Sequence, residues 1–375
     1  MIENPFIITE KIIPEYFCDR VKESQELIKL LINGNNVVLL SQRRIGKTGL
    51  IQFCYQQKPL KKDFITIYID ILSTTNLQEF TYILGREVFE VIRHRGDGMW
   101  KSFLKIVKSL SGKISFDPLT GLPSLNLQLG DIRKPDYTLK EIFQYLDSAD
   151  KPCIVAIDEF QQIRNYPEKN IEALIRSYLL QINNCRMIFS GSEKHILSDM
   201  FSNASKPFYL SASFLELNVI PREDYIAFIG DLFKQRSKTI STRLAAEIYD
   251  MFHGITFYVQ RVCNGIFANT DYHSSASQET LEYTLDGLIS SYDVIFRERM
   301  SRFTLRQKEL LLAIAKEKIA ERIMSVEFIN KYSLTSASGV QTSLKSLMNS
   351  GLVIKQADGY AIADQFFRIW LNRNF

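Results

Sequence analysis

Gly46, Lys47 and Thr48 follow one another shortly after the apolar run VVLLS, and residue types in that order suit phosphate chemistry. A strand that enters a tight turn and then a helix presents backbone N–H groups to an anion. In such a loop the lysine reaches the β- and γ-phosphates, and the threonine hydroxyl ligates Mg²⁺. The G-K-T tripeptide is common by chance, but the strand before it favours a P-loop, the phosphate-binding loop of many nucleotide-binding proteins.

The predicted nucleotide-binding residues of this loop form one continuous stretch: Arg43, Arg44, Ile45, Gly46, Lys47, Thr48 and Gly49. Ser41 stands where the usual pattern begins with glycine, so the loop departs from that pattern at its first position. Lys47 is also a predicted catalytic residue, because a cation stabilises the negative charge of a transferring phosphoryl group. Further candidates for a transition-state cation, among which the sequence does not choose, are Arg43, Arg44, Arg164, Arg176 and Arg186.

The second half of such a site is an apolar strand that ends in an acidic residue, and residues 153–159, CIVAIDE, supply one. We expect Asp158 to hold Mg²⁺ together with Thr48, directly or through water. Glu159 is the predicted general base, which polarises the water that attacks the γ-phosphate. A strand can also end in acidic residues merely because it reaches solvent. The combination with the upstream G-K-T favours a site for ATP or ADP with Mg²⁺.

Ser190-Gly191-Ser192 closes a further predicted strand. Ser190 is a predicted catalytic residue, because its hydroxyl could face the γ-phosphate and the attacking water. The same tripeptide is equally consistent with a plain turn, since serine and glycine are both common in turns.

Five short apolar runs are the predicted strands, at residues 36–41, 64–72, 152–158, 186–190 and 213–220. Helical segments separate them, among others at residues 50–57, 77–94 and 170–181. Strands that are nearly continuously apolar belong in a parallel sheet covered on both faces. The sequence therefore predicts a doubly wound α/β domain over residues 1–220. Residues 221–290 are a predicted small helical domain without strands.

Residues 111–133 interrupt the α/β pattern with a predicted β-hairpin insertion. Leu125, Leu127 and Leu129 alternate with polar residues, and prolines and glycines mark turns. The favoured interpretation is a lid over an exposed sheet edge, and the alternative is a surface that recruits a partner protein.

Residues 291–375 are the third predicted domain, a winged helix. Three helical patterns are followed by two brief strands that are joined by Asp358-Gly359, a strong hairpin turn. The third helix of such modules usually enters the major groove of DNA. Here that helix offers Gln341, Thr342 and a single cation, Lys345, although attraction to phosphates drives most DNA affinity. DNA binding and protein docking therefore both remain open.

The composition is that of an ordinary soluble globular protein, with 46% hydrophobic and 23% charged residues among 375. The N-terminal segment lacks the order of a signal peptide, and no apolar run approaches the ~20 residues of a membrane span. The five cysteines are odd in number and far apart, so we expect reduced, mostly buried thiols in a cytoplasmic protein. The net charge of +4 is mild and does not by itself indicate nucleic-acid binding.

Several segments together resemble the prokaryotic P-loop ATPases often called archaeal-type ATPases, which are relatives of the AAA+ and STAND ATPases. These segments are FCDR followed by ESQELIKLL, then SQRRIGKTGLI, IVAIDEFQQI, IFSGSE, HGITFYVQRVC and ADQFFRIWL. The resemblance spans almost the whole chain. It implies an ASCE-type core, a helical lid and a C-terminal winged helix, with ATP between core and lid. It also implies that Phe17 and Arg20 lie near the adenine, and that Gly254 to Tyr258 form the nucleotide-facing turn of the lid.

Two departures from these relatives bear on turnover. Thr256 replaces a proline that is common in the lid turn, so a stiffening residue is missing. Leu210 follows Pro207-Phe208-Tyr209, where relatives often carry an arginine. We therefore expect a slowly hydrolysing AAA+/STAND-like ATPase that acts as a nucleotide-dependent switch. The alternative is a DNA-binding regulator or a protein scaffold with a structural nucleotide, and the sequence does not indicate the oligomeric state.

Overall fold

The computed structural model describes residues 4–8, 14–18, 20–116, 123–356 and 358–375. The described residues divide into two compact units. The sheet unit comprises Ile7–Phe228 and Gly254–Phe257, and the C-terminal unit comprises Ile229–His253 and Tyr258–Phe375 with the described residues before Ile7. The domain boundaries predicted at residues 220 and 290 remain predictions.

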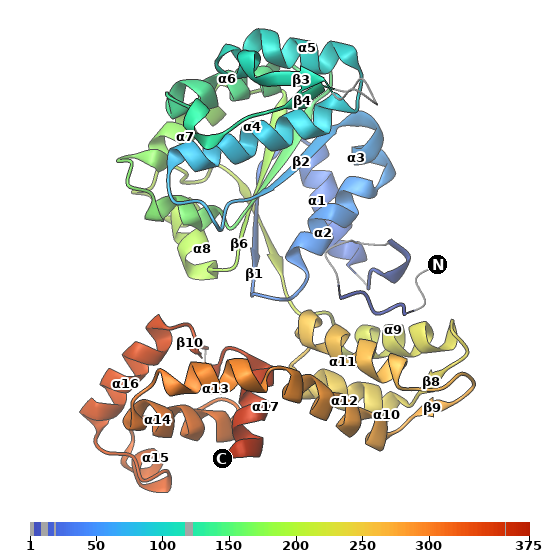
Figure 1. Cartoon of the computed structure of the whole chain (residues 1–375), viewed down its shortest axis with the longest axis vertical. Helices are drawn as coiled ribbons and strands as arrows, with labels where there is room; N and C mark the ends of the chain where they lie inside the picture. The colour runs from blue at the N-terminus through green and yellow to red at the C-terminus, as the bar shows by residue number, and fades with distance from the viewer. Residues whose placement is uncertain (1–3, 9–13, 19, 117–122, 357) are drawn as a thin grey trace. The chain divides into compact units, whose positions relative to one another are not determined.

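The sheet unit is built on five parallel strands in the spatial order β2-β5-β6-β1-β7 (Figure 1). These strands are β1 (Val37–Ser41), β2 (Ile65–Asp70), β5 (Cys153–Asp158), β6 (Cys185–Gly191) and β7 (Ser213–Leu217). All five predicted strands are therefore present, and the predicted parallel sheet is confirmed. β6 lies between the strands that carry the two phosphate-site motifs, so its carboxyl end adjoins both.

Helices cover both faces of the sheet, as continuously apolar strands require. Along β5, Val155 and Ile157 belong to one core, whereas Ile154 and Ala156 belong to the core on the opposite face. The second of these cores is covered by α1 (Val21–Ile32), α2 (Lys47–Gln56) and α3 (Lys58–Asp63). The first is covered by α4 (Leu77–Arg93), α6 (Pro135–Ser148), α7 (Ile171–Leu179) and α8 (Lys194–Ser202) (Figure 1).

The predicted hairpin insertion is present but shorter than expected. After α5 (Asp97–Ile106) and the 3₁₀ helix Lys108–Lys113, β3 (Ile114–Phe116) pairs antiparallel with β4 (Pro123–Leu125). The expected strand alternation through Leu127 and Leu129 was wrong, because β4 ends at Leu125 and Leu129 begins a 3₁₀ helix. The predicted turn at Pro118 and Gly121 lies outside the described residues.

The expectation of no strands within 221–290 was also wrong. β8 (Thr239–Ile240) and β9 (Ser275–Ala276) form a short parallel pair. Strands of two residues are too short to produce an alternating apolar pattern in the sequence, so they could not be predicted from it. Otherwise the segment is helical, with α9 (Arg222–Lys234), α10 (Thr242–Met251), α11 (Thr256–Ala268), α12 (Gln278–Ser291) and, beyond residue 290, α13 (Asp293–Ser301).

The predicted winged helix is confirmed in the C-terminal unit. Its helices are α14 (Leu305–Lys316), α15 (Val326–Lys331) and α16 (Ala337–Asn349), and its wing pairs β10 (Val353–Lys355) with β11 (Tyr360–Ile362). Gly359 is needed in the wing, because a Cβ there would lie 2.5 Å from the Ala320 carbonyl oxygen. A last helix, α17 (Gln365–Asn374), completes the module with a buried face of Phe366, Phe367, Trp370 and Leu371.

All five cysteines are free and buried, as the sequence predicts. Among the described residues, none of the helices combines the length and the apolar character that crossing a membrane would require.

Candidate nucleotide site

The loop between β1 and α2 has the backbone of a phosphate-binding turn. Gly46 has φ +92°, in the region that favours glycine, and α2 begins at the next residue, Lys47. The helix therefore starts three residues earlier than the predicted segment 50–57. No side chain caps this helix end, and no acidic residue lies in its first turn. The first backbone N–H groups of α2 are thus available to an anion.

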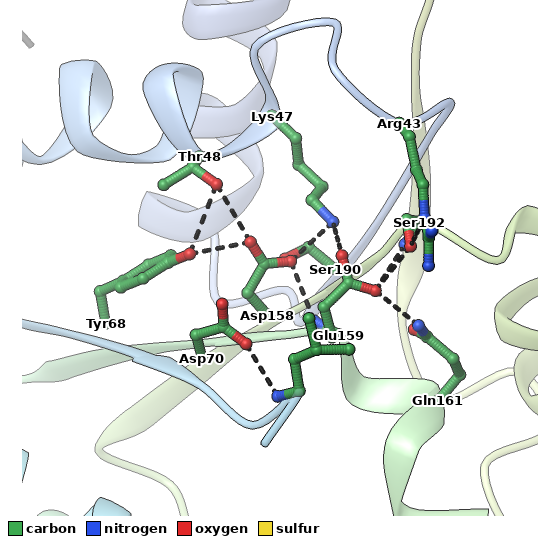
Figure 2. Close-up of polar contacts among 11 residues, drawn as sticks. Arg43, Lys47, Thr48, Tyr68, Asp70, Asp158, Glu159, Gln161, Ser190 and Ser192 are labelled. Atoms are coloured by element: carbon green, nitrogen blue, oxygen red, sulfur yellow. Dashed lines mark hydrogen bonds and ion pairs between the residues drawn. The ribbon is translucent and has the colours of Figure 1, made fainter. Parts of the chain in front are cut away.

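Asp158, at the carboxyl end of β5, is the centre of the polar cluster shown in Figure 2. Lys47 Nζ lies 2.6 Å from its Oδ1, and Ser190 Oγ donates to the same oxygen at 2.8 Å. Thr48 Oγ1 and the Tyr68 hydroxyl donate to Oδ2 at 3.1 and 2.8 Å. The predicted pair of motifs on β1 and β5 therefore meets in space.

Glu159 follows Asp158 with φ +56°, a strained conformation for a residue other than glycine. Its Oε1 lies 3.2 Å from Lys47 Nζ. Its Oε2 accepts three hydrogen bonds: from Gln161 Nε2 at 2.6 Å, from Ser192 Oγ at 2.8 Å and from the Ser192 backbone N–H at 3.0 Å (Figure 2). The two oxygens of this carboxylate thus have different environments.

Burial and the Lys47 ammonium shift the pKa values of Asp158 and Glu159 in opposite directions. Burial raises the pKa of Asp158, but the charge of Lys47 and several hydrogen bonds bring that pKa below its usual value. The same balance lowers the pKa of Glu159. Asp70, paired in register with Asp158 at the end of β2, instead has a raised pKa, because burial and the neighbouring carboxylates disfavour its charge. Burial also raises the pKa of Tyr68, so its hydroxyl stays protonated and donates.

The oxygen atoms of Thr48 and Asp158 fit a magnesium ion. Mg²⁺ prefers oxygen ligands, and proteins usually supply one or two carboxylates while phosphates and waters complete the shell. Thr48 Oγ1 and Asp158 Oδ2 lie 3.1 Å apart, and Asp158 already neutralises a cation, the Lys47 ammonium. The chemistry of this donor set therefore suits the predicted metal.

Two other predicted residues lie beside the loop. Arg20 is buried, and its guanidinium donates to the Ile45 carbonyl at 3.3 Å. Phe17 stacks on Phe53 of α2, with ring centroids 4.3 Å apart. Gly49 is buried in the first turn of α2. The predicted adenine contacts of Phe17 and Arg20 stay predictions.

The segment Gly254–Phe257 belongs to the sheet unit and contacts the P-loop directly. Thr256 Oγ1 donates to the Ile45 carbonyl at 3.3 Å, and the Phe257 backbone N–H donates to the Arg44 carbonyl at 3.0 Å. The Arg44 guanidinium lies over the Phe257 ring, 5.0 Å from its centroid. A proline at position 256 could not supply this hydroxyl, so the threonine gives the loop a hydrogen bond that a proline would lack.

Two predicted residues have other partners in the structure. Tyr258 lies in the C-terminal unit, where its hydroxyl accepts from the Gln365 backbone N–H at 3.1 Å and lies 3.4 Å from Asp364 Oδ1. Its role in nucleotide binding stays a prediction. Ser190 is fully buried and donates to Asp158, whereas the neighbouring Ser192 contacts Glu159. Sensing of the γ-phosphate by Ser190 likewise stays a prediction.

Sequence reasoning missed Tyr68 and Gln161 and gave Ser192 no role of its own. Tyr68 reaches Asp158 because β2 neighbours β5, and Gln161 reaches Glu159 because the chain turns into a 3₁₀ helix (Phe160–Asn165) there. The only signal for Gln161 was its position two residues after a predicted base. Arg43, predicted to contact nucleotide, donates from Nε to Ser192 Oγ at 3.0 Å.

Two sequence families match the chain. Residues 17–262 match a family described as an ATPase domain predominantly from Archaea, and residues 294–373 match a probable winged helix domain. No curated protein matches the sequence.

Solved structures share the fold at low sequence identity. The Walker-type ATPase of Pyrococcus abyssi has a TM-score of 0.66 at 20% identity, covering 98% of this chain and 99% of that chain. The ORC2 protein of Aeropyrum pernix in its ADP form has a TM-score of 0.54 at 14% identity, covering 99% and 97%. Cdc6p of Pyrobaculum aerophilum has a TM-score of 0.50 at 14% identity, covering 98% and 96%. Since the first family match spans more than half of the residues, this chain belongs to the family of ATPase domains found predominantly in Archaea, with a winged helix at its C-terminal end.

Proposed function

We propose that this ATPase binds ATP with Mg²⁺, hydrolyses it slowly, and acts as a nucleotide-dependent switch of the AAA+/STAND kind. The observation that carries the proposal is the position of Lys47, which lies between the carboxylates of Asp158 and Glu159 at the start of an uncapped helix. A triphosphate offers this lysine several anionic oxygens. When Lys47 turns to the phosphates, Asp158 becomes free for Mg²⁺ and Glu159 becomes free to accept a proton.

The chemistry follows from these positions. Mg²⁺, held by Thr48 and Asp158, would neutralise charge on the β- and γ-phosphates. Glu159 accepts a proton from water while the water oxygen bonds to the γ-phosphorus and the bond from that phosphorus to the β–γ bridging oxygen breaks. Lys47 and the N–H groups of α2 stabilise the charge on the phosphoryl oxygens.

The proposed switch is supported by the path of the chain, which connects the P-loop side to the winged helix through a short segment. Gly254–Phe257 belongs to the sheet unit, while the residues on either side of it belong to the C-terminal unit. Within the sheet unit this segment bonds to the Arg44 and Ile45 carbonyls, and within the C-terminal unit Tyr258 bonds to the start of α17. A change in the P-loop can therefore bias the winged helix through residues 256–258 of the chain.

The experiment that tests binding and turnover compares wild type with Lys47→Ala and Glu159→Gln. We expect wild type to bind ATP in calorimetry, and Lys47→Ala to bind at least about tenfold more weakly, since a charged contact contributes roughly 1.5–3 kcal/mol. Glu159→Gln should bind ATP but release phosphate on the order of 100-fold more slowly.

The control for these variants is Lys61→Ala, an exposed lysine on α3, which should bind ATP and release phosphate as wild type does. Absence of ATP binding by wild type, or unchanged affinity in Lys47→Ala, would contradict the nucleotide site. Equal phosphate release by Glu159→Gln and wild type would remove Glu159 as the base.

A second candidate function is binding of duplex DNA through the winged helix. It is favoured by the charge of residues 294–373, which include thirteen Lys and Arg but seven Asp and Glu. The exposed face of α16 offers Gln341, Thr342 and Lys345, so phosphate contacts outside this helix would have to supply most of the affinity.

Fluorescence anisotropy with duplex DNA at increasing salt tests this second function. If DNA is bound, the logarithm of the association constant should fall linearly with the logarithm of salt concentration. Lys345→Ala should weaken binding and make this slope shallower by about one phosphate contact, whereas Lys61→Ala should leave both unchanged. Absent or salt-independent binding would favour protein docking by the winged helix.

A further inference from the structure

We propose that Gln161 and Ser192 are positioning residues that hold the Glu159 carboxylate in the orientation needed for ATP hydrolysis, and that Gly191 provides the space for Gln161 to do so. The inference rests on the proposed function of Glu159 as the base. It concerns three residues to which neither the motifs nor the comparisons assign a role.

The hydrogen bonds of Glu159 are unequally distributed between its two oxygens. Three donors converge on Oε2, namely the Gln161 amide, the Ser192 hydroxyl and the Ser192 backbone N–H, at 2.6, 2.8 and 3.0 Å. Oε1 contacts Lys47 Nζ at 3.2 Å. The lysine marks the side on which a phosphate would lie, so the three donors turn the remaining oxygen toward the reacting group.

Burial and the chemistry of the amide favour the orientation in which Gln161 donates to Glu159. Its side chain is 5% exposed, and its Oε1 has no hydrogen-bond partner among the described residues. Rotating the amide would place Oε1 against a carboxylate oxygen, which cannot donate when ionised. The orientation with Nε2 toward Glu159 is therefore the favoured one, although it leaves a buried oxygen unpaired.

The position of the Gln161 amide requires a residue without a Cβ at position 191. A Cβ at this position would lie 1.9 Å from Gln161 Oε1 and 3.0 Å from its Cδ. Those atoms are the end of a flexible side chain, so an alanine here would displace the amide of Gln161 and leave β6 in place. The glycine between the two serines is therefore explained by the space that the Gln161 amide needs, and a plain turn would not require it.

Arg43 extends the arrangement into the P-loop. Its Nε donates to Ser192 Oγ at 3.0 Å, and Ser192 Oγ in turn donates to Glu159. Because the hydroxyl accepts from Arg43, its single proton is directed at the carboxylate. The phosphate loop and the general base are therefore joined by a chain of two hydrogen bonds (Figure 2).

The experiment measures kcat and KM for ATP in steady-state phosphate release. Gln161→Met keeps the length of the side chain and removes the donor, and we expect kcat to fall on the order of 10–100-fold with KM within about twofold. Gln162→Met is the matched control, since the Gln162 side chain donates to the Thr74 carbonyl, while the bond to the Glu159 carbonyl comes from the backbone N–H, which methionine keeps. It should keep kcat and KM within about twofold of wild type.

Gly191→Ala and Ser192 variants separate positioning from folding. Gly191→Ala should lower kcat as Gln161→Met does, and Gln161→Ala combined with Gly191→Ala should be no slower than Gln161→Ala alone, because the obstructed side chain is gone. Ser192→Ala should lower kcat, while Ser192→Thr, which keeps the hydroxyl, should restore it. These variants remain informative if Gln161→Met does not fold.

Four results would overturn the inference in whole or in part. An unchanged kcat in folded Gln161→Met, or additive effects of the substitutions at 161 and 191, would overturn positioning while the ATPase activity stands. Equal kcat values for Ser192→Ala and Ser192→Thr would show that the Ser192 hydroxyl does not position Glu159. Failure of wild type to release phosphate would overturn the proposed hydrolysis and this inference together.

Discussion

Lys47 is held by two carboxylates whose burial would otherwise disfavour their charge. Its side chain and that of Asp158 are 9% and 5% exposed, so water screens this contact poorly. Loss of one partner from such a pair leaves a buried charge without compensation. Removal of Lys47 would therefore leave the carboxylates of Asp158 and Glu159 without a compensating cation in the protein without nucleotide.

This balance predicts how Lys47→Ala changes stability with pH. In wild type the pKa values of Asp158 and Glu159 are lowered, so their contribution is present above about pH 4 and is lost as the pH falls through the folded values. Without the lysine, only the remaining hydrogen bonds oppose burial, so both pKa values rise and less of this contribution remains. The destabilisation by Lys47→Ala should therefore grow between pH 4 and pH 7 in urea unfolding. The effect of Lys61→Ala should stay constant, and a constant effect of Lys47→Ala would contradict the explanation.

At the scale of the elements, α2 lacks the side-chain cap with which several other helices of this chain begin. Asn76, Ser241, Thr304 and Ser325 accept backbone hydrogen bonds at the starts of α4, α10, α14 and α15. The start of α2 has Gly46 and no side-chain cap. A capped helix end satisfies its own N–H groups, whereas an uncapped one can offer them to a ligand.

Asn76→Ala tests the ordinary role of a cap in this molecule. Asn76 Oδ1 accepts from the Glu79 backbone N–H at 2.9 Å, and its loss should lower the free energy of unfolding by about 1 kcal/mol. Asn76→Ser retains an acceptor and should lower it by less. Urea unfolding measures both effects. ATP affinity should not change in either variant, and a loss of affinity would show that α4 contributes to the site.

At the scale of the whole molecule, α17 bonds within the C-terminal unit to residues on both sides of the segment Gly254–Phe257. Phe366 packs against Phe252 and Tyr258, with ring centroids 5.7 and 5.0 Å apart. The buried Arg368 donates to the Met251 carbonyl at 3.4 Å, close to the end of α10. Burial lowers the pKa of this arginine, which nevertheless remains charged at neutral pH. Within the C-terminal unit, α17 therefore contacts Met251, Phe252 and Tyr258.

Tyr258→Phe tests whether this packing transmits the nucleotide state. The change removes the acceptor of the Gln365 N–H and should cost about 1–3 kcal/mol of stability, because that buried group loses its partner. If the switch is correct, ATP should alter hydrogen exchange in α17 of wild type, and the variant should show a smaller change. Tyr283→Phe, at an exposed tyrosine of α12, is the control. Identical exchange in α17 with and without ATP in wild type would contradict the switch.

The sequence by itself determined the strands and the two halves of the phosphate site. Short, nearly continuous apolar runs are typical of strands in a covered sheet, and Gly46-Lys47-Thr48 and Asp158-Glu159 are local patterns that need no knowledge of distant contacts. The winged helix was readable for the same reason, since its helices and its Asp-Gly turn are local. The two-residue strands β8 and β9 were missed, because so short a pairing leaves no periodicity.

Only the tertiary structure decided which side chains surround the two carboxylates. The strand order places β6 beside β1 and β5, and this neighbourhood brings Ser190 to Asp158 and Ser192 to Glu159. Tyr68 and Gln161 reach the same carboxylates from the neighbouring β2 and from the 3₁₀ turn after β5. Such convergence depends on register and on the packing of segments distant in the chain, which the residue types along one strand do not specify.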